Sequence, residues 1–169
     1  MKKIKRLRVI KVCMVMLLFA VLLSVIGLAQ ERPKITKICM VHITFGKDAA
    51  KEAIITWRSS ESNAEGYVRY WPAHSPNAVK EAKAEYHDYR YARDRVYIYD
   101  ARLELEPNTL YCYKVYCAGE ESPEYSFYSA PEKGSDVGFT FAVMGDSRSG
   151  YDTWAQLMRV AEESGARFV

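Results

Sequence analysis

The spacing of apolar residues over 34–131 is the feature that most restricts how this chain can fold. Apolar and polar residues alternate there with a period of two, which is the period of a half-buried β-strand and not of a helix. In the segment MVHITF (40–45), one face should therefore hold Val41, Ile43 and Phe45. The chain is expected to be mostly β over this stretch.

Five further segments show the same alternation and are separated by turn residues. They read AIITWR, GYVRYW, RVYIYDARLEL, LYCYKVYC and EYSFYSAP, at 53–58, 66–71, 95–105, 110–117 and 124–131. Short strands rich in Tyr, Val and Ile with polar turns between them are typical of an antiparallel β-sandwich. We therefore predict one such sandwich over residues 33–132.

The segment LELEPNTLYCYKVYCA (103–118) gives the sharpest prediction within the sandwich. Pro107 and Asn108 should make the turn, and Tyr111 can bury its ring while its hydroxyl hydrogen-bonds back to the backbone, as in a tyrosine corner. The residues of this strand expected to face the core are Tyr111, Tyr113, Val115 and Cys117. Trp57 occupies the place of a buried tryptophan of fibronectin type III modules, so the region resembles a fibronectin type III domain.

The first 29 residues should precede the folded part of the chain. Residues 1–11 carry six Lys and Arg and no acid, and they lead into an uncharged apolar run at 12–29. This is the pattern of a secretory signal peptide cut before Gln30. The run is also long enough for an uncleaved anchor helix. Under either interpretation the basic flank stays cytoplasmic and the rest is exported, with a membrane met only through an uncleaved leader.

The charge of the chain argues against a nucleic-acid partner. The chain has 24 Lys and Arg against 21 Asp and Glu, but six of the basic residues lie before Gln30, which leaves the exported part at −3. A weakly acidic chain without a basic cluster is a poor ligand for a phosphate backbone. The Tyr-rich and Arg-containing stretch 85–100 is interpreted as a half-exposed strand, because its Asp residues offset the arginine charges.

Three cysteines follow the leader, and an odd number leaves at least one thiol free or paired between chains. Cys112 and Cys117 lie five apart on one predicted strand and point to opposite faces, so they should not pair with each other. Cys39 is the third. No spacing suggests a zinc site, and we expect ordinary buried or surface thiols. The histidines are expected to be solvated side chains: His42, His74 and His87.

The pattern changes after EKGSDVG (132–138), a segment of linker character. Residues 139–144 form a continuous apolar run, as in a strand covered on both faces. A helix is predicted next, on the spacing of Trp154, Leu157, Met158 and Ala161. Asp152 should be its N-cap and Gly165 its C-terminal stop, and the last three residues begin another strand. We thus predict the first β-α unit of an incomplete α/β domain over 137–169.

The order of these elements resembles the purple acid phosphatases and their bacterial relatives within the calcineurin-like metallophosphoesterases. The matching segments are VHITFGKDAAKEAIITWRS (41–59), YIYDARLELEPNTLYCYKVY (97–116) and FTFAVMGDSR (139–148). The resemblance implies hydrolysis of phosphate esters at a dinuclear metal centre, in which iron is paired with iron, zinc or manganese. It also implies that Asp146, after the apolar strand, stands at the family's first metal-binding position. Taken alone, Gly-Asp after a strand is also an ordinary turn signal.

The departures from the family pattern limit what this chain can do. Arg148 stands where many metallophosphoesterases carry a histidine ligand, and a guanidinium has no lone pair to offer. The sequence contains no Gly-Asp-x-x-Tyr, Gly-Asn-His-Glu or Gly-His-x-His. We therefore predict Asp146 as a metal ligand and assign no catalytic residue. The 169-residue chain, taken as the N-terminal part of such an enzyme, should be inactive by itself.

Two classes of function remain open at this point. The first is a phosphoesterase whose full-length form acts on phosphate monoesters or diesters. The second is an exported β-sandwich that binds a partner or serves as a spacer, with the Gly-Asp segment as a remnant of a catalytic domain.

Overall fold

The computed structural model describes residues 37–62, 64–91, 94–145 and 149–169. These residues form eight strands and one helix: β1 (Cys39–Phe45), β2 (Glu52–Ser59), β3 (Gly66–Pro72), β4 (Lys80–Tyr91), β5 (Asp94–Glu104), β6 (Leu110–Cys117), β7 (Glu120–Glu121), β8 (Tyr125–Tyr128) and α2 (Tyr151–Glu163). The predicted leader, 1–29, lies outside the described residues. None of the helices described is long and apolar enough to cross a membrane.

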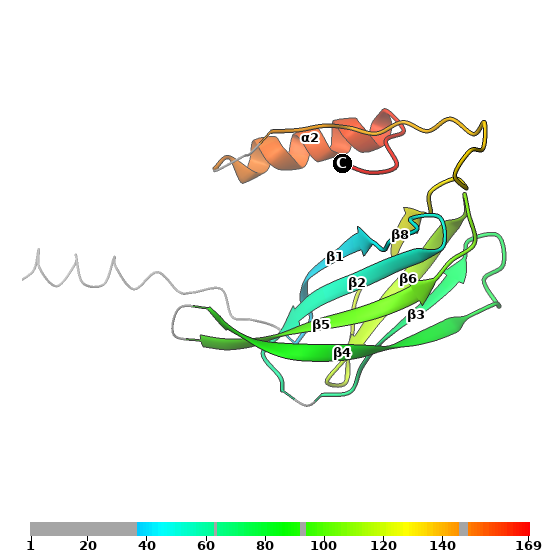
Figure 1. Ribbon diagram of the computed structural model, residues 1–169. Helices are drawn as coiled ribbons and strands as arrows, with labels where there is room; N and C mark the ends of the chain where they lie inside the picture. Colours follow the sequence, from blue (N-terminus) through cyan, green and yellow to red (C-terminus); the bar gives the residue numbers. More distant parts are fainter. Residues whose placement is uncertain (1–36, 63, 92–93, 146–148) are drawn as a thin grey trace, which may run out of the picture. The chain divides into compact units, whose positions relative to one another are not determined.

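The strands form one curled antiparallel sheet, in the order β1-β2-β5-β4-β3-β6-β7, with β8 also paired to β6. The long strand β4 makes the curl possible, because its residues 80–83 pair with β3 and its residues 84–91 pair with β5. The sheet therefore folds into two facing layers, one with β1, β2 and β5 and one with β3, β6 and β8 (Figure 1). The antiparallel sandwich predicted from the alternation is confirmed.

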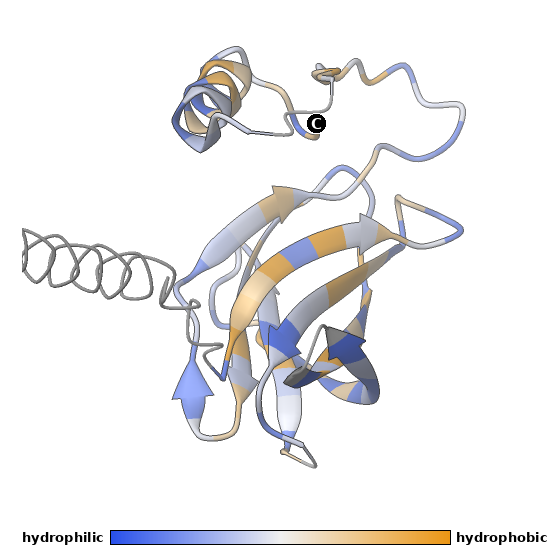
Figure 2. Ribbon diagram, turned by 90° about the vertical axis from the view of Figure 1, so that its left-hand side faces the viewer, coloured by the Kyte–Doolittle hydropathy of each residue, from blue (hydrophilic) through white to orange (hydrophobic). Residues whose placement is uncertain are grey.

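The core lies between the two layers. Hydrophobic and hydrophilic residues alternate along the strands (Figure 2), and β2 and β6 alternate between half-buried and buried over their whole lengths. Trp57 is fully buried, as predicted, and its ring stacks on that of Tyr99 with centroids 5.3 Å apart. The four residues of β6 predicted to face the core are all buried: Tyr111, Tyr113, Val115 and Cys117.

The stretch 85–100, predicted as one half-exposed strand, is a hairpin of β4 and β5. Tyr86 of β4 pairs with Tyr99 of β5, and Tyr91 of β4 pairs with Asp94 of β5. The two strands are therefore antiparallel neighbours in the chain. The prediction was wrong because YARD (91–94) contains none of the Asn-Gly, Asp-Gly or Gly-Gly pairs that mark a tight hairpin turn. The half-exposed character is correct, since the Tyr86 and Tyr89 side chains are exposed.

Helix α2 lies where the helical spacing predicts it, but it begins differently. Asp152 is not the N-cap: Gly150 occupies that position with a left-handed φ of 84° and makes no side-chain cap. Asp152 lies in the first turn, where a carboxylate still interacts favourably with the helix N-terminus.

The predicted stop at Gly165 is confirmed. Its φ of 77° is left-handed, and its N–H donates to the carbonyl of Glu162 at 2.9 Å. The N–H of Ala166 donates to the carbonyl of Ala161 at 3.0 Å, which completes a Schellman motif. The motif turns the chain back toward the run that precedes the helix.

The apolar run 139–144 is not a regular strand. Thr140 and Ala166 form an isolated parallel bridge, supported by a hydrogen bond from the Arg167 N–H to the Thr140 carbonyl at 2.9 Å. The physical reason is that a parallel strand needs neighbours and covering helices, and the described residues supply a single short partner. The side chains of Phe139 and Phe141 consequently remain exposed.

Candidate functional site

The predicted metal ligand, Asp146, lies outside the described residues, as does Arg148. The residues on either side are described: the run 139–144 and Gly145 lead to this position, and helix α2 follows it. Among the described residues, no group of three or more His, Cys, Asp or Glu side chains is arranged to hold a metal ion. The described part of the chain therefore does not fit a dinuclear centre on its own.

The histidines and cysteines behave as ordinary side chains. His42, His74 and His87 are exposed, as predicted. Among the described residues, the free thiols are those of Cys39, Cys112 and Cys117. Burial raises the pKa of the Cys112 thiol, and nearby Glu124 raises it further, which disfavours the reactive thiolate.

A row of interacting side chains, here called the polar ladder, lies on the outer face of β3 and β6 and consists of Tyr67, Tyr116, Arg69 and Glu81 of the neighbouring β4. The rings of Tyr67 and Tyr116 stack with centroids 4.9 Å apart, and the Arg69 guanidinium lies 5.3 Å and 5.1 Å from the two centroids. Arg69 Nε also lies 3.2 Å from the carboxylate of Glu81. A pocket of about 420 Å³ lies beside these tyrosines, with Glu120 on its wall. The Arg69 charge is paired within the ladder, so this face offers no free guanidinium to an anionic ligand.

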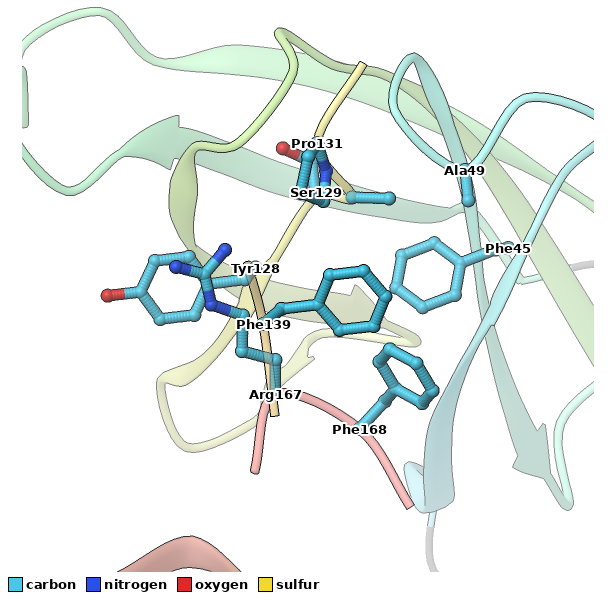
Figure 3. Close-up of a pocket in the computed structure, with 9 residues that line it drawn as sticks. Phe45, Ala49, Tyr128, Ser129, Pro131, Phe139, Arg167 and Phe168 are labelled. Atoms are coloured by element: carbon cyan, nitrogen blue, oxygen red, sulfur yellow. The ribbon is translucent and has the colours of Figure 1, made fainter. Parts of the chain in front are cut away.

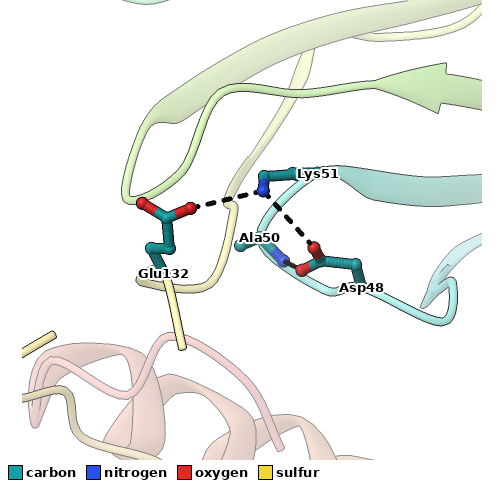
Figure 4. Close-up of polar contacts among 4 residues, drawn as sticks. All are labelled: Asp48, Ala50, Lys51 and Glu132. Atoms are coloured by element: carbon teal, nitrogen blue, oxygen red, sulfur yellow. Dashed lines mark hydrogen bonds and ion pairs between the residues drawn. The ribbon is translucent and has the colours of Figure 1, made fainter. Parts of the chain in front are cut away.

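The chain leaves the sandwich through a segment held by the β1–β2 loop (Figure 4). Lys51 Nζ lies 3.3 Å from Glu132 Oε1 and 3.8 Å from Asp48 Oδ2. The Ala50 N–H donates to Asp48 Oδ1 at 3.1 Å, which closes the loop. The backbone N–H of Ala130 donates to the same loop at 3.0 Å. The start of the linker is therefore fixed to the sandwich, whereas residues 133–138 are exposed.

An apolar pocket of about 260 Å³ lies where the β-α unit meets the sandwich. The rings of Phe45, Phe139 and Phe168 form its walls together with Pro131 (Figure 3). Sequence analysis missed this pocket because its walls come from segments far apart in the chain. The sequence signal for this pocket was the position of two phenylalanines, Phe139 just after the linker and Phe168 just after the helix. Both residues were predicted to lie in strands.

Arg167 is the charged residue that lines this pocket, and it makes specific contacts with the sandwich. Its Nη1 donates a hydrogen bond of 2.7 Å to Asn108 Oδ1, in the turn between β5 and β6. Its guanidinium carbon lies 4.4 Å from the centroid of the Tyr128 ring, at the end of β8. Sequence analysis assigned Arg167 only to the start of a strand and gave it no role.

Comparison with known proteins gives consistent matches. The family model "Purple acid Phosphatase, N-terminal domain" matches residues 38–129. The Fe(3+)-Zn(2+) purple acid phosphatase 12 of Arabidopsis thaliana is 30% identical over 115 residues, which cover 67% of this chain and 24% of that protein. The purple acid phosphatase of Glycine max is 31% identical over 118 residues, with the same two shares. This chain thus spans about a quarter of the length of these relatives.

A solved structure shows a similar fold. The purple acid phosphatase PPD1 from yellow lupin seeds superimposes with a TM-score of 0.53 at 24% identity, over 60% of this chain and 21% of that one. The similarity supports the arrangement of strands described above.

Proposed function

Because the chain belongs to the purple acid phosphatase family, whose N-terminal domain it contains at residues 38–129, we propose that it is the N-terminal part of an exported metallophosphoesterase. In this proposal the sandwich is a non-catalytic domain and residues 137–169 open the catalytic domain. The observation that carries the proposal is the order of parts. The family domain is followed, after a short linker, by an apolar run that leads directly into Gly145 and Asp146.

We propose Asp146 as the first metal ligand of that catalytic domain. A carboxylate oxygen is a suitable donor for a hard cation such as ferric iron, and α/β sheets place ligands beyond the carboxyl ends of their strands. When bound, two metal ions would supply charge for the phosphoryl oxygens and a water of lowered pKa. The other donors would have to come from the rest of the protein, so residues 1–169 alone should not hydrolyse phosphate esters.

The substrate class that follows from this proposal is a phosphate ester. Export would proceed through the leader at 1–29, and no nucleic-acid partner is proposed. N-terminal sequencing of the mature protein after cell fractionation tests the export step. Intact cytoplasmic protein that still begins at Met1 would contradict it.

The central experiment compares Asp146→Asn with wild type in the whole protein read from the gene. Asn keeps the size of the side chain and removes the anionic oxygen. We expect loss of bound metal and of most of kcat for p-nitrophenyl phosphate, with unchanged unfolding of the sandwich. Asp152→Asn is the matched control, because Asp152 is an exposed carboxylate in the first turn of α2 and should leave both metal and rate unchanged.

Three results would contradict parts of the proposal. Full metal content and turnover in Asp146→Asn would make Asp146 an ordinary turn residue. Turnover by residues 1–169 that Asp146→Asn abolishes would refute the proposed inactivity of this part. A reading frame without further metal-ligand motifs would favour the exported binding or spacer module.

A further inference from the structure

We infer that Arg167 is a positioning residue that locks the run leading to Asp146 against the sandwich. Only the importance of Asp146 rests on the proposed function, because the contact itself is formed by described residues. A turn of the sandwich would in this way set the orientation of the apolar run 139–144, with which the proposed catalytic domain opens.

Arg167 contacts the sandwich with its side chain and the apolar run 139–144 with its backbone. Its side chain reaches the sandwich at Asn108 and Tyr128. Its backbone N–H donates to the carbonyl of Thr140 at 2.9 Å, and the next carbonyl, that of Phe168, accepts from the N–H of an alanine in the same run at 3.0 Å. A shift of Arg167 must therefore also move the run that ends next to Asp146.

The acceptor on the sandwich is rigidly held. Asn108 has a left-handed φ of 50°, and its N–H donates to the carbonyl of Ala130 at 2.9 Å. The N–H of the next residue, Thr109, donates to Ser129 Oγ at 2.8 Å, and the Thr109 hydroxyl donates to the carbonyl of Pro107 at 2.9 Å. The Asn108 amide oxygen is therefore presented from a turn that has little freedom to follow a moving partner.

The rest of the contact is poorly suited to fix an orientation. A pocket of about 260 Å³ remains between the phenylalanine rings and the sandwich, so apolar packing there is incomplete. Apolar contact is also non-directional. A guanidinium, in contrast, combines a planar fork of donors with stacking on an aromatic face, and both require a defined geometry. Arg167 is thus the directional element of the contact.

The chain supplies a matched control in Arg159. This arginine lies in α2 of the same β-α unit and is exposed, and its side chain makes no hydrogen bond or ion pair with the described residues. Removing it changes the charge as much as removing Arg167 does, without touching the sandwich. Asn108 offers a second clean substitution, since Asn108→Gly removes the acceptor and tolerates the positive φ.

The experiment measures amide hydrogen exchange in residues 1–169, comparing wild type with Arg167→Ala, Arg167→Lys, Asn108→Gly and Arg159→Ala. We expect Arg167→Ala and Asn108→Gly each to raise exchange at the amides of Ala142 and Arg167 (position 167 in all variants) by about tenfold, with β2 and β6 unchanged. The double variant should exchange no faster than Arg167→Ala alone, because Arg167→Ala already removes the hydrogen bond to Asn108 together with the contact to Tyr128. Arg167→Lys should restore only part of the protection, since an ammonium lacks the planar fork.

Exchange in Arg167→Ala within about twofold of wild type would overturn the inference, as would an equal increase in Arg159→Ala. In the whole protein, Arg167→Ala should lower kcat several-fold with KM unchanged. An unchanged kcat would overturn the positioning role. A whole wild-type protein without phosphatase activity would instead count against the proposed function. The hydrogen-exchange result would still decide whether Arg167 holds the run against the sandwich.

Discussion

The hydroxyl of Tyr111 accepts a hydrogen bond of 2.8 Å from the backbone N–H of Glu106, five residues earlier in the chain. The Tyr111 ring is fully buried and stacks on Phe127 with centroids 5.9 Å apart. This is the tyrosine corner predicted from the Pro-Asn turn and the Tyr that follows it. One side chain thus closes the turn between β5 and β6 and contributes to the core.

Replacing Tyr111 by Phe tests the value of that hydroxyl. The ring keeps its packing, but the Glu106 N–H loses its acceptor, so the free energy of unfolding should fall by about 1–3 kcal/mol. Urea unfolding of Tyr111→Phe and of Tyr89→Phe gives the comparison. The Tyr89 ring is 53% exposed, and its variant should stay within about 0.5 kcal/mol of wild type. Equal losses in the two variants would show that the corner hydrogen bond contributes nothing specific.

Strands and core residues could be predicted from the sequence because alternation records burial locally. Trp57 and the inward residues of β6 follow from counting positions along one strand. The β4–β5 reversal could not be found in the same way, because YARD (91–94) contains none of the glycine pairs that mark a tight hairpin turn. The predictions failed where no local residue type marked the change of direction.

Trp57→Ala should lower the free energy of unfolding by about 3–5 kcal/mol, because it deletes a large fully buried ring that stacks on Tyr99. Trp71→Ala is the control: Trp71 is only half-buried on the outer side of β3, and its loss should be clearly smaller. Chemical denaturation followed by circular dichroism measures both. A loss below about 1 kcal/mol for Trp57→Ala would contradict the central place of this ring in the core.

Gly66→Ala should also be destabilising, for the opposite reason. A Cβ at this position would lie 2.8 Å from Tyr99 Cδ1 and 3.0 Å from Trp57 Cζ2, so the stacked rings would have to move. Overpacking of this kind costs about 1–3 kcal/mol. Thermal unfolding measures both variants, and Gly138→Ala, where an added Cβ meets nothing within 4 Å, should show no loss. Unchanged stability in Gly66→Ala would mean that the rings yield easily.

The contact at Arg167 could not be predicted because its partners are 59 residues apart. Periodicity and turn signals describe neighbours in sequence, whereas Asn108 and Arg167 meet only after the sandwich has closed and α2 has reversed the chain. Asp146 is the converse case. The motif and the family resemblance identify it, while the assignment as a metal ligand stays a prediction.

The raised pKa values of two buried tyrosines predict how the free energy of unfolding changes at alkaline pH. Burial raises the pKa of Tyr99 and that of Tyr113 to about 12, with smaller contributions from Cys117 and Tyr125 respectively. The ordinary tyrosine pKa is about 10, so the unfolded chain releases these protons first. The folded state holds them more tightly. The stability they contribute is therefore complete below about pH 10 and is lost as the pH rises toward about 12.

Denaturant unfolding at a series of alkaline pH values measures this dependence, with tyrosinate absorbance as a second signal. Tyr113→Phe removes one of these titrating hydroxyls and keeps the ring that packs against Phe127. Its free energy of unfolding should fall less steeply than that of wild type between about pH 10 and 12, and the two curves should run parallel below that range. Tyr89→Phe, the exposed control, should follow wild type throughout. If Tyr113→Phe declined as steeply as wild type, deprotonation of the buried Tyr113 would not be a cause of the alkaline loss.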